Sequence, residues 1–140
     1  MIKIRLWHKK LIKVLPRNQL LGQVRELTLI IKNISIIGTP NHILVNKIMD
    51  YSMDHLYTYC NLIIHEMKKR NYKLTQKTYL KWHYFFNQYN LKIICFDDLF
   101  YKWHNDDYYK ICYYNLYEKY LCGGITKNEF LAINNKSYKI

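Results

Sequence analysis

The chain of 140 residues has few of the residues that break helices, build metal clusters or mark a membrane segment. It has only four Gly and two Pro, and no linker or internal repeat divides it. Its four Cys are widely spaced without a C-x-x-C pair, and its six His lack metal-ligand spacing, so we expect reduced thiols and no metal. No apolar run approaches the roughly 18 residues that cross a bilayer, and the N-terminus lacks a secretory signal. We therefore expect one intracellular domain, residues 1–140, without membrane contact.

Acidic residues are also scarce, because 22 Lys and Arg stand against 10 Asp and Glu, a formal net charge of +12. Such a balance is typical of nucleic-acid-binding proteins, since Lys and Arg displace counterions from phosphate. The alternative is the codon bias of an AT-rich genome, which would leave most of the charge as solvated surface. The start of the chain favours nucleic acid, because seven cations, three of them Arg, precede the first acid, Glu26.

Hydrophobic residues recur at helical spacing along most of the chain, which predicts an all-α fold of about five helices. The helices are predicted after Pro16, from Thr39 to about Asp50, over residues 54–70, after Thr75 and over residues 106–121, with a short final turn that a Thr126 and Glu129 capping box begins. The residues predicted to face the interior from the third and fourth helices are Leu56, Tyr59, Cys60, Ile63 and Met67, and Tyr79, Trp82, His83 and Phe86. Gly123 and Gly124 end the fifth helix, and residues 90–101 are predicted as a loop.

In the first helix, an apolar stripe around Leu20, Leu27 and Ile31 leaves Glu26 on the opposite side, about 150° from its centre. Gln19 and Gln23 are predicted on the same side as Glu26. A carboxylate on a basic surface that faces DNA repels phosphate and weakens binding, so it indicates chemistry, such as stabilising a cationic sugar or moving a proton. The alternative is an exposed Glu in an ordinary ion pair with Arg25 or Lys13.

Three strings near the N-terminus resemble a known family. They are Arg5-Leu6-Trp7-His8, Leu15-Pro16-Arg17 and Gln19-Leu20-Leu21-Gly22-Gln23-Val24-Arg25-Glu26-Leu27. In this order they resemble the N-terminal signature of the pyrimidine-dimer DNA glycosylase/AP lyases, the endonuclease V class of phages and their bacterial relatives. The resemblance continues more weakly through His42 and residues 50–72, whereas the C-terminal half is similar only in being helical and aromatic.

The resemblance implies a compact single-domain helical fold with an extended N-terminal segment that crosses the core. It implies a monomeric DNA repair enzyme that acts on lesion-containing double-stranded DNA without a cofactor. In the family, the N-terminal α-amine attacks C1′ of the damaged nucleotide to form an imine, and a glutamate assists glycosyl cleavage and β-elimination. The catalytic residues would be Met1 and Glu26, and the residues expected to contact DNA are Lys3, Arg5, Arg17, Gln19, Gln23 and Arg25.

The nucleophile stays open, because this chain has a few more residues before Arg5 than the family pattern. An α-amine, with a pKa of about 7.7–8.0, keeps a useful neutral fraction at pH 7, which favours Met1 over an ordinary Lys. The alternatives are Lys3 with a lowered pKa, or a loss of activity. Two other functions also stay open: a non-catalytic nucleic-acid-binding protein with the same fold, and a helical interaction domain whose charge reflects codon use.

Overall fold

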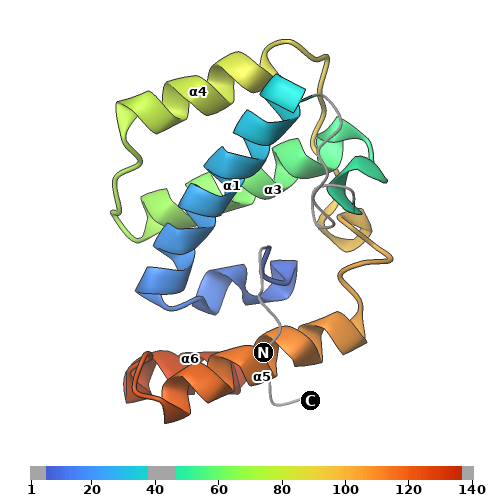
Figure 1. The fold of residues 1–140 in the computed structure, drawn as a ribbon. Coiled ribbons are helices and arrows are strands. Elements are labelled where there is room, and N and C mark those ends of the chain that lie inside the picture. Colours follow the sequence, from blue (N-terminus) through green and yellow to red (C-terminus); the bar gives the residue numbers. More distant parts are fainter. Residues whose placement is uncertain (1–5, 38–46, 137–140) are drawn as a thin grey trace.

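The computed structural model describes residues 6–37 and 47–136, without the side chains of residues 36, 37 and 136. Within these ranges the chain is all-α and has no strand, as predicted (Figure 1). The elements are the 3-10 helix η1 (Lys9–Val14), α1 (Arg17–Ile37), α3 (Met53–Lys69), α4 (Gln76–Phe86), the 3-10 helix η2 (Phe96–Asp98), α5 (Asp106–Leu121) and α6 (Lys127–Lys136). Of the helix predicted from Thr39, residues 47–49 are helical, and Thr39 itself lies outside the described residues.

The helices form two groups on either side of η1. In the upper group of Figure 1, α1 packs against α3 and α4, and in the lower group α5 packs against α6. The helix η1 contacts both α3 and α6 and so joins the two groups. Among the described residues, no helix is long and apolar enough to span a membrane.

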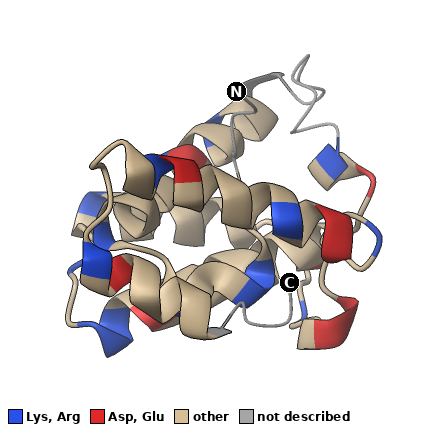
Figure 2. Cartoon of the chain, turned by 90° about the horizontal axis from the view of Figure 1, so that it is seen from below, with Lys and Arg blue, Asp and Glu red and all other residues tan. Residues whose placement is uncertain are grey.

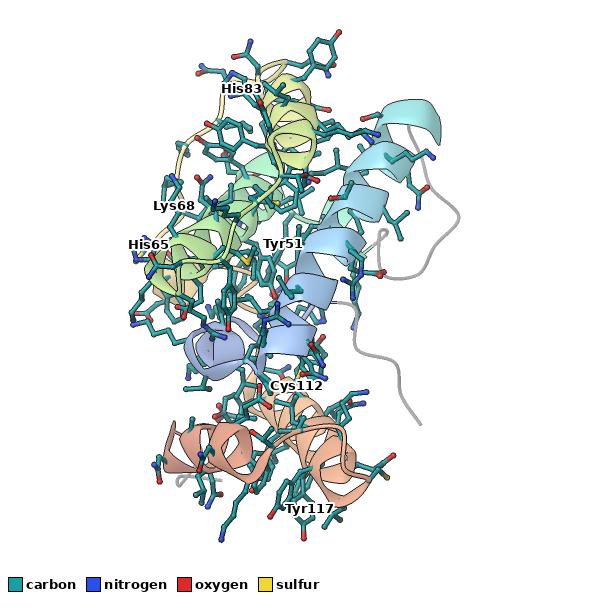
Figure 3. The ribbon with its side chains drawn as sticks, turned by 90° about the vertical axis from the view of Figure 1, so that its left-hand side faces the viewer. Tyr51, His65, Lys68, His83, Cys112 and Tyr117 are labelled. Carbon is teal, nitrogen blue, oxygen red and sulfur yellow. The ribbon has the colours of Figure 1, made fainter. Side chains whose placement is uncertain are left out.

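The core follows the apolar stripes of the helices. All five residues predicted to face inward from α3 are buried, and so are Trp82 and Phe86 of α4. The prediction is wrong for Tyr79 and His83, which are exposed. The short helix α4 buries the i, i+3, i+4 set Trp82, Phe85 and Phe86, whereas His83 lies at the outer edge of the molecule (Figure 3).

The ends of α5 follow local sequence rules. Asn105 begins the helix, and its side chain accepts a hydrogen bond of 2.8 Å from Tyr108 N. Gly123 ends it with φ of 82°, a backbone conformation that favours glycine. The N–H groups of Gly123 and Gly124 donate to the carbonyls of Tyr120 and Lys119, at 3.0 and 2.8 Å. The predicted bounds, 106–121, are therefore confirmed.

The capping box of α6 is present and extends to α1. Glu129 N donates to Thr126 Oγ1, and Thr126 N donates to Glu129 Oε1, each at 3.1 Å. The second carboxylate oxygen of Glu129 accepts a 3.0 Å hydrogen bond from Arg17 N at the start of α1. Burial acts to raise the pKa of Glu129, but these main-chain donors outweigh it and lower the pKa. The final turn was predicted too short, since α6 has 10 residues.

Arg70, just beyond α3, fixes the segment that leads into α1. Its guanidinium pairs with Glu66 at 2.8 Å and donates to the carbonyl of Leu15 at 2.7 Å. It also donates to the carbonyls of Ile12 and Lys13. The last turn of α3 therefore sets where α1 begins.

The two faces of α5 differ. Cys112 and Leu116 are buried, and Cys112 lies on the side of the upper group, whereas Tyr117 points away from it (Figure 3). The cysteines of the chain are free thiols, as expected, with Cys60 and Cys112 buried and Cys95 and Cys122 exposed. The segment predicted as a loop contains no strand and includes only the short helix η2.

Candidate active site

The third turn of α1 carries the candidate carboxylate. Glu26 is half-buried and Arg25 is exposed, so Glu26 faces solvent less fully than its helical position predicts. Gly22 lies one turn before Glu26 on the same face, and side chains on a helix lean toward its N-terminus. The position that a Cβ at Gly22 would take is 3.5 Å from Arg25 Nη2. The Arg25 guanidinium therefore folds back over Gly22, on the side toward which Glu26 leans.

Arg17 and Gln19 lie in the first turn of α1. Arg17 is exposed, and its guanidinium lies over the ring of Tyr72, 5.7 Å from the centroid. Gln19 is half-buried, and its Oε1 has no hydrogen-bond partner among the described residues. The helix α1 thus carries four of the predicted site residues, Arg17, Gln19, Arg25 and Glu26.

Gln23 differs from its prediction. It was expected to face outward beside Glu26, but only 2% of it is exposed. Its Oε1 accepts a 2.9 Å hydrogen bond from Trp7 N. The physical reason is that the buried main chain at Trp7 needs an acceptor, and Gln23 supplies it from the inner side of α1. In this structure Gln23 therefore bonds the protein's own N-terminal segment instead of facing DNA.

Residues 6–8 are the described part of the N-terminal segment before η1. The side chains of Leu6, Trp7 and His8 are buried. The carbonyl of Trp7 accepts a 2.6 Å hydrogen bond from Tyr59 Oη of α3, and the carbonyl of Leu6 accepts one from Tyr108 Oη of α5. The described part of the N-terminal segment thus lies within the core, whereas Met1, Lys3 and Arg5 lie outside the described residues.

Two buried histidines pack together beside this segment. The rings of His8 and His104 have centroids 4.9 Å apart. Burial lowers the pKa of His8 from 6.5 to about 4, although hydrogen bonds to the main chain of His104 and Asn105 act in the opposite direction. Burial, with the nearby His8 and Lys9, lowers the pKa of His104 to about 2. Both imidazoles are therefore neutral at pH 7.

The sequence comparison decides the family. A model of the pyrimidine dimer DNA glycosylase family matches residues 4–80, more than half of the chain. The chain belongs to this glycosylase family. Neither the curated proteins nor the solved structures contain a match. As a member of the family, this glycosylase is a DNA repair enzyme and its substrate is DNA.

The positive charge of the glycosylase is less concentrated than its sequence suggests. Lys9, one of the seven early cations, is buried, and its Nζ donates to the carbonyls of Phe96, Asp97 and Leu99 at 2.6, 3.1 and 2.7 Å. Its charge therefore holds η2 and is not available to phosphate. In Figure 2, basic positions are spread over several helices, with acidic positions among them. The exposed cations of the described N-terminal segment and of α1 up to Glu26 are Lys10, Lys13, Arg17 and Arg25.

Sequence reasoning missed the residues that hold the glycosylase's N-terminal segment. Tyr59 was predicted as core and Tyr108 was not assigned a role, yet both bond its main chain. Lys9 and His104, which are joined by a 2.9 Å bond from Lys9 N to His104 Nδ1, were not assigned either. A buried tyrosine gives no local signal of which distant carbonyl it bonds. Among the described residues, no group of three or more His, Cys, Asp or Glu could hold a metal ion.

Proposed function

We propose that this glycosylase removes pyrimidine dimers from duplex DNA and then nicks the strand as an AP lyase. The α-amine of Met1 attacks C1′ of the damaged nucleotide, the N-glycosidic bond breaks and the base leaves. The amine adduct then loses a proton from nitrogen, and the C1′–O4′ bond breaks while O4′ takes up a proton, so the sugar ring opens and an imine forms at C1′. Removal of a C2′ proton then breaks the C3′–O bond in a β-elimination, and water releases the amine by hydrolysing the imine.

Glu26 is the carboxylate that assists these steps. As an anion it stabilises the cationic sugar during base loss, and it moves protons at the sugar during the later steps. Arg25 contacts phosphate beside it, because its guanidinium is exposed and its planar fork binds phosphate in a bidentate manner. Lys3, Arg5, Arg17 and Gln19 extend this DNA contact.

The observation that carries the proposal is that the segment leading to the N-terminus is bonded to the helix that bears Glu26. Trp7 N donates to Gln23 of α1, three residues before Glu26, so residue 7 of the segment that leads to the amine is held on the helix that carries Glu26. The exposed Arg25 folded over Gly22 adds a phosphate ligand on that helix. The family match supports the substrate, since its description names the pyrimidine dimer.

The variant Glu26→Gln tests the role of the carboxylate. It removes the charge and keeps the size of the side chain, so nicking of ultraviolet-irradiated plasmid should fall by at least about a hundredfold. Binding of the same DNA should be equal or tighter, because a group that repels phosphate is lost. Asn33→Asp, farther along α1, is a control that changes charge on this helix without altering Glu26. Wild-type protein that binds irradiated DNA without nicking it would instead indicate the non-catalytic DNA-binding protein.

Borohydride trapping identifies the nucleophile. Reduction of the imine on abasic DNA should give a covalent adduct, and peptide mapping should place it on the Met1 amine. Lys3→Ala should still give the adduct. An adduct on Lys3 would refute the Met1 assignment and keep the imine chemistry, whereas the absence of an adduct would refute both.

A further inference from the structure

Residues 6 and 7 are bonded by side chains from three different helices. Gln23 of α1 accepts from Trp7 N, Tyr59 of α3 donates to the carbonyl of Trp7, and Tyr108 of α5 donates to the carbonyl of Leu6. We call Gln23, Tyr59 and Tyr108 the N-terminal clamp. These partners lie 16, 52 and 102 residues away in the sequence, so the clamp forms only when the three helices are assembled.

The clamp satisfies main-chain groups that no regular structure satisfies. Residues 6–8 precede η1 and belong to no helix, and a buried main-chain N–H or carbonyl without a partner is costly. Because the three bonds go to consecutive main-chain groups, they fix the path of the chain as well as its depth. A single side chain packed against Trp7 would allow rotation that the three bonds prevent.

The members of the clamp also depend on one another. Tyr59 Oη lies 2.6 Å from the carbonyl of Trp7 and 3.0 Å from Gln23 Oε1, so α1 and α3 meet at this residue. Burial holds the pKa of Tyr59 and that of Tyr108 above the usual value, so both hydroxyls stay protonated and can donate. Both hydroxyls are therefore donors at neutral pH.

We infer that Gln23, Tyr59 and Tyr108 are positioning residues for the α-amine nucleophile. This inference rests on the proposed function. The clamp holds residues 6 and 7, the first described residues after the amine, in a fixed relation to α1, which carries Glu26. Attack on C1′ requires the amine and the sugar in a near-attack geometry, and a displacement of about 1 Å can cost about a hundredfold in rate. None of the three residues needs to touch DNA.

The test separates the rate of imine formation from DNA binding. Tyr59→Phe and Tyr108→Phe each remove one hydroxyl and keep the ring. With saturating protein, borohydride trapping on an abasic duplex should slow several-fold in each variant and at least about tenfold in the double variant. The dissociation constant for a duplex with an uncleavable abasic-site analogue should stay within about twofold of wild type, since the two hydroxyls bond the protein's own main chain.

Tyr51→Phe is the matched control. The Tyr51 hydroxyl also bonds a main-chain group, accepting from Trp103 N at 3.1 Å, but not in the N-terminal segment (Figure 3). This variant should lose stability in urea and trap at the wild-type rate. Gln23 gives a second comparison, because Gln23→Glu keeps an acceptor for Trp7 N and should trap faster than Gln23→Met, which has none.

The outcomes distinguish the two proposals. Clamp variants that trap as fast as wild type, or slow only as much as Tyr51→Phe, would overturn the positioning role and leave the proposed function intact. Wild-type protein that forms no adduct would overturn the proposed function, and the positioning role with it. Equal trapping by Gln23→Glu and Gln23→Met would remove Gln23 from the clamp's role.

Discussion

We predict that the protein loses stability in mild acid because of its buried histidines. His8, His55 and His104 each accept a main-chain N–H at Nδ1, from Lys10 at 3.1 Å, from Phe100 at 3.1 Å and from Lys9 at 2.9 Å. Each neutral ring thus carries its proton on Nε2, and acid would protonate Nδ1. Protonation both places a charge in the core and breaks a main-chain hydrogen bond. Burial accordingly lowers the pKa of all three histidines.

The magnitude follows from proton linkage. The unfolded chain binds protons near pH 6.5, whereas folded His8 and His104 bind them only near pH 4 and pH 2. Stability therefore falls as the pH falls through 6.5 and continues to fall down to the folded pKa. From about pH 7.5 to about pH 5, each of these two histidines lowers the free energy of unfolding by about 2 kcal/mol, or about 4 kcal/mol together. His55 acts in the same direction.

Urea unfolding followed by circular dichroism measures this loss at several pH values between these limits. In His104→Asn, the Asn oxygen can accept from Lys9 N without titrating, so the loss between the two pH values should shrink by about 2 kcal/mol. His83→Asn is the control, because His83 is exposed on α4. A wild-type stability that is flat over this range, or a His104→Asn protein with the same pH dependence as wild type, would refute the reasoning. Glu129, whose pKa is lowered from 4.5, responds below this range.

Two further predictions concern helix ends and the site surface. Gly22→Ala should raise the free energy of unfolding by about 0.5–1 kcal/mol, because alanine favours the helix. It should not slow plasmid nicking, because a Cβ at residue 22 meets Arg25 only at contact distance. Gly22→Leu should slow nicking, because its larger side chain fills the space over which Arg25 lies. Equal nicking by the two variants would contradict this. Glu129→Ala should lower the free energy of unfolding in urea by about 1–2 kcal/mol, because the N-termini of α1 and α6 each lose a hydrogen-bond acceptor. Asn128→Ala, at the exposed neighbouring residue, is the control and should change the free energy of unfolding little.

Local chemistry made much of the fold predictable from the sequence. The bounds of α5 depend on Asn105 at one end and Gly123 at the other, and both act on main-chain groups within a few residues. The inner stripe of α3 depends on helical spacing alone. The capping box of α6 is likewise visible as Thr126 and Glu129 three residues apart. In each case the partners are close in sequence, so their geometry is determined by the helix itself.

The parts that could not be predicted depend on contacts between distant segments. Gln23 was predicted to face solvent because a polar side chain on a helix is usually assigned to the exposed face. No nearby residue indicates that Trp7 N needs an acceptor. The same holds for Lys9, whose three carbonyl partners lie 87 to 90 residues away. His83 was placed inside from its position on a helix that has aromatic residues on several faces. The positions of Glu26 and Arg25 on α1 could be predicted from helical spacing, whereas the distant residues that bond the N-terminal segment could not.

The contacts of the N-terminal segment also bear on which part of the chain can fold by itself. The family match ends at residue 80, but Leu6, Lys9 and Arg17 bond Tyr108, His104 and Glu129, which lie beyond it. A fragment limited to the matching residues would keep Glu26 but would lose the three residues that bond its N-terminal segment and the start of α1. The end of the match is thus a limit of sequence similarity and not the boundary of an autonomous folding unit. The residues after the family match therefore help to hold the matching residues in their folded arrangement.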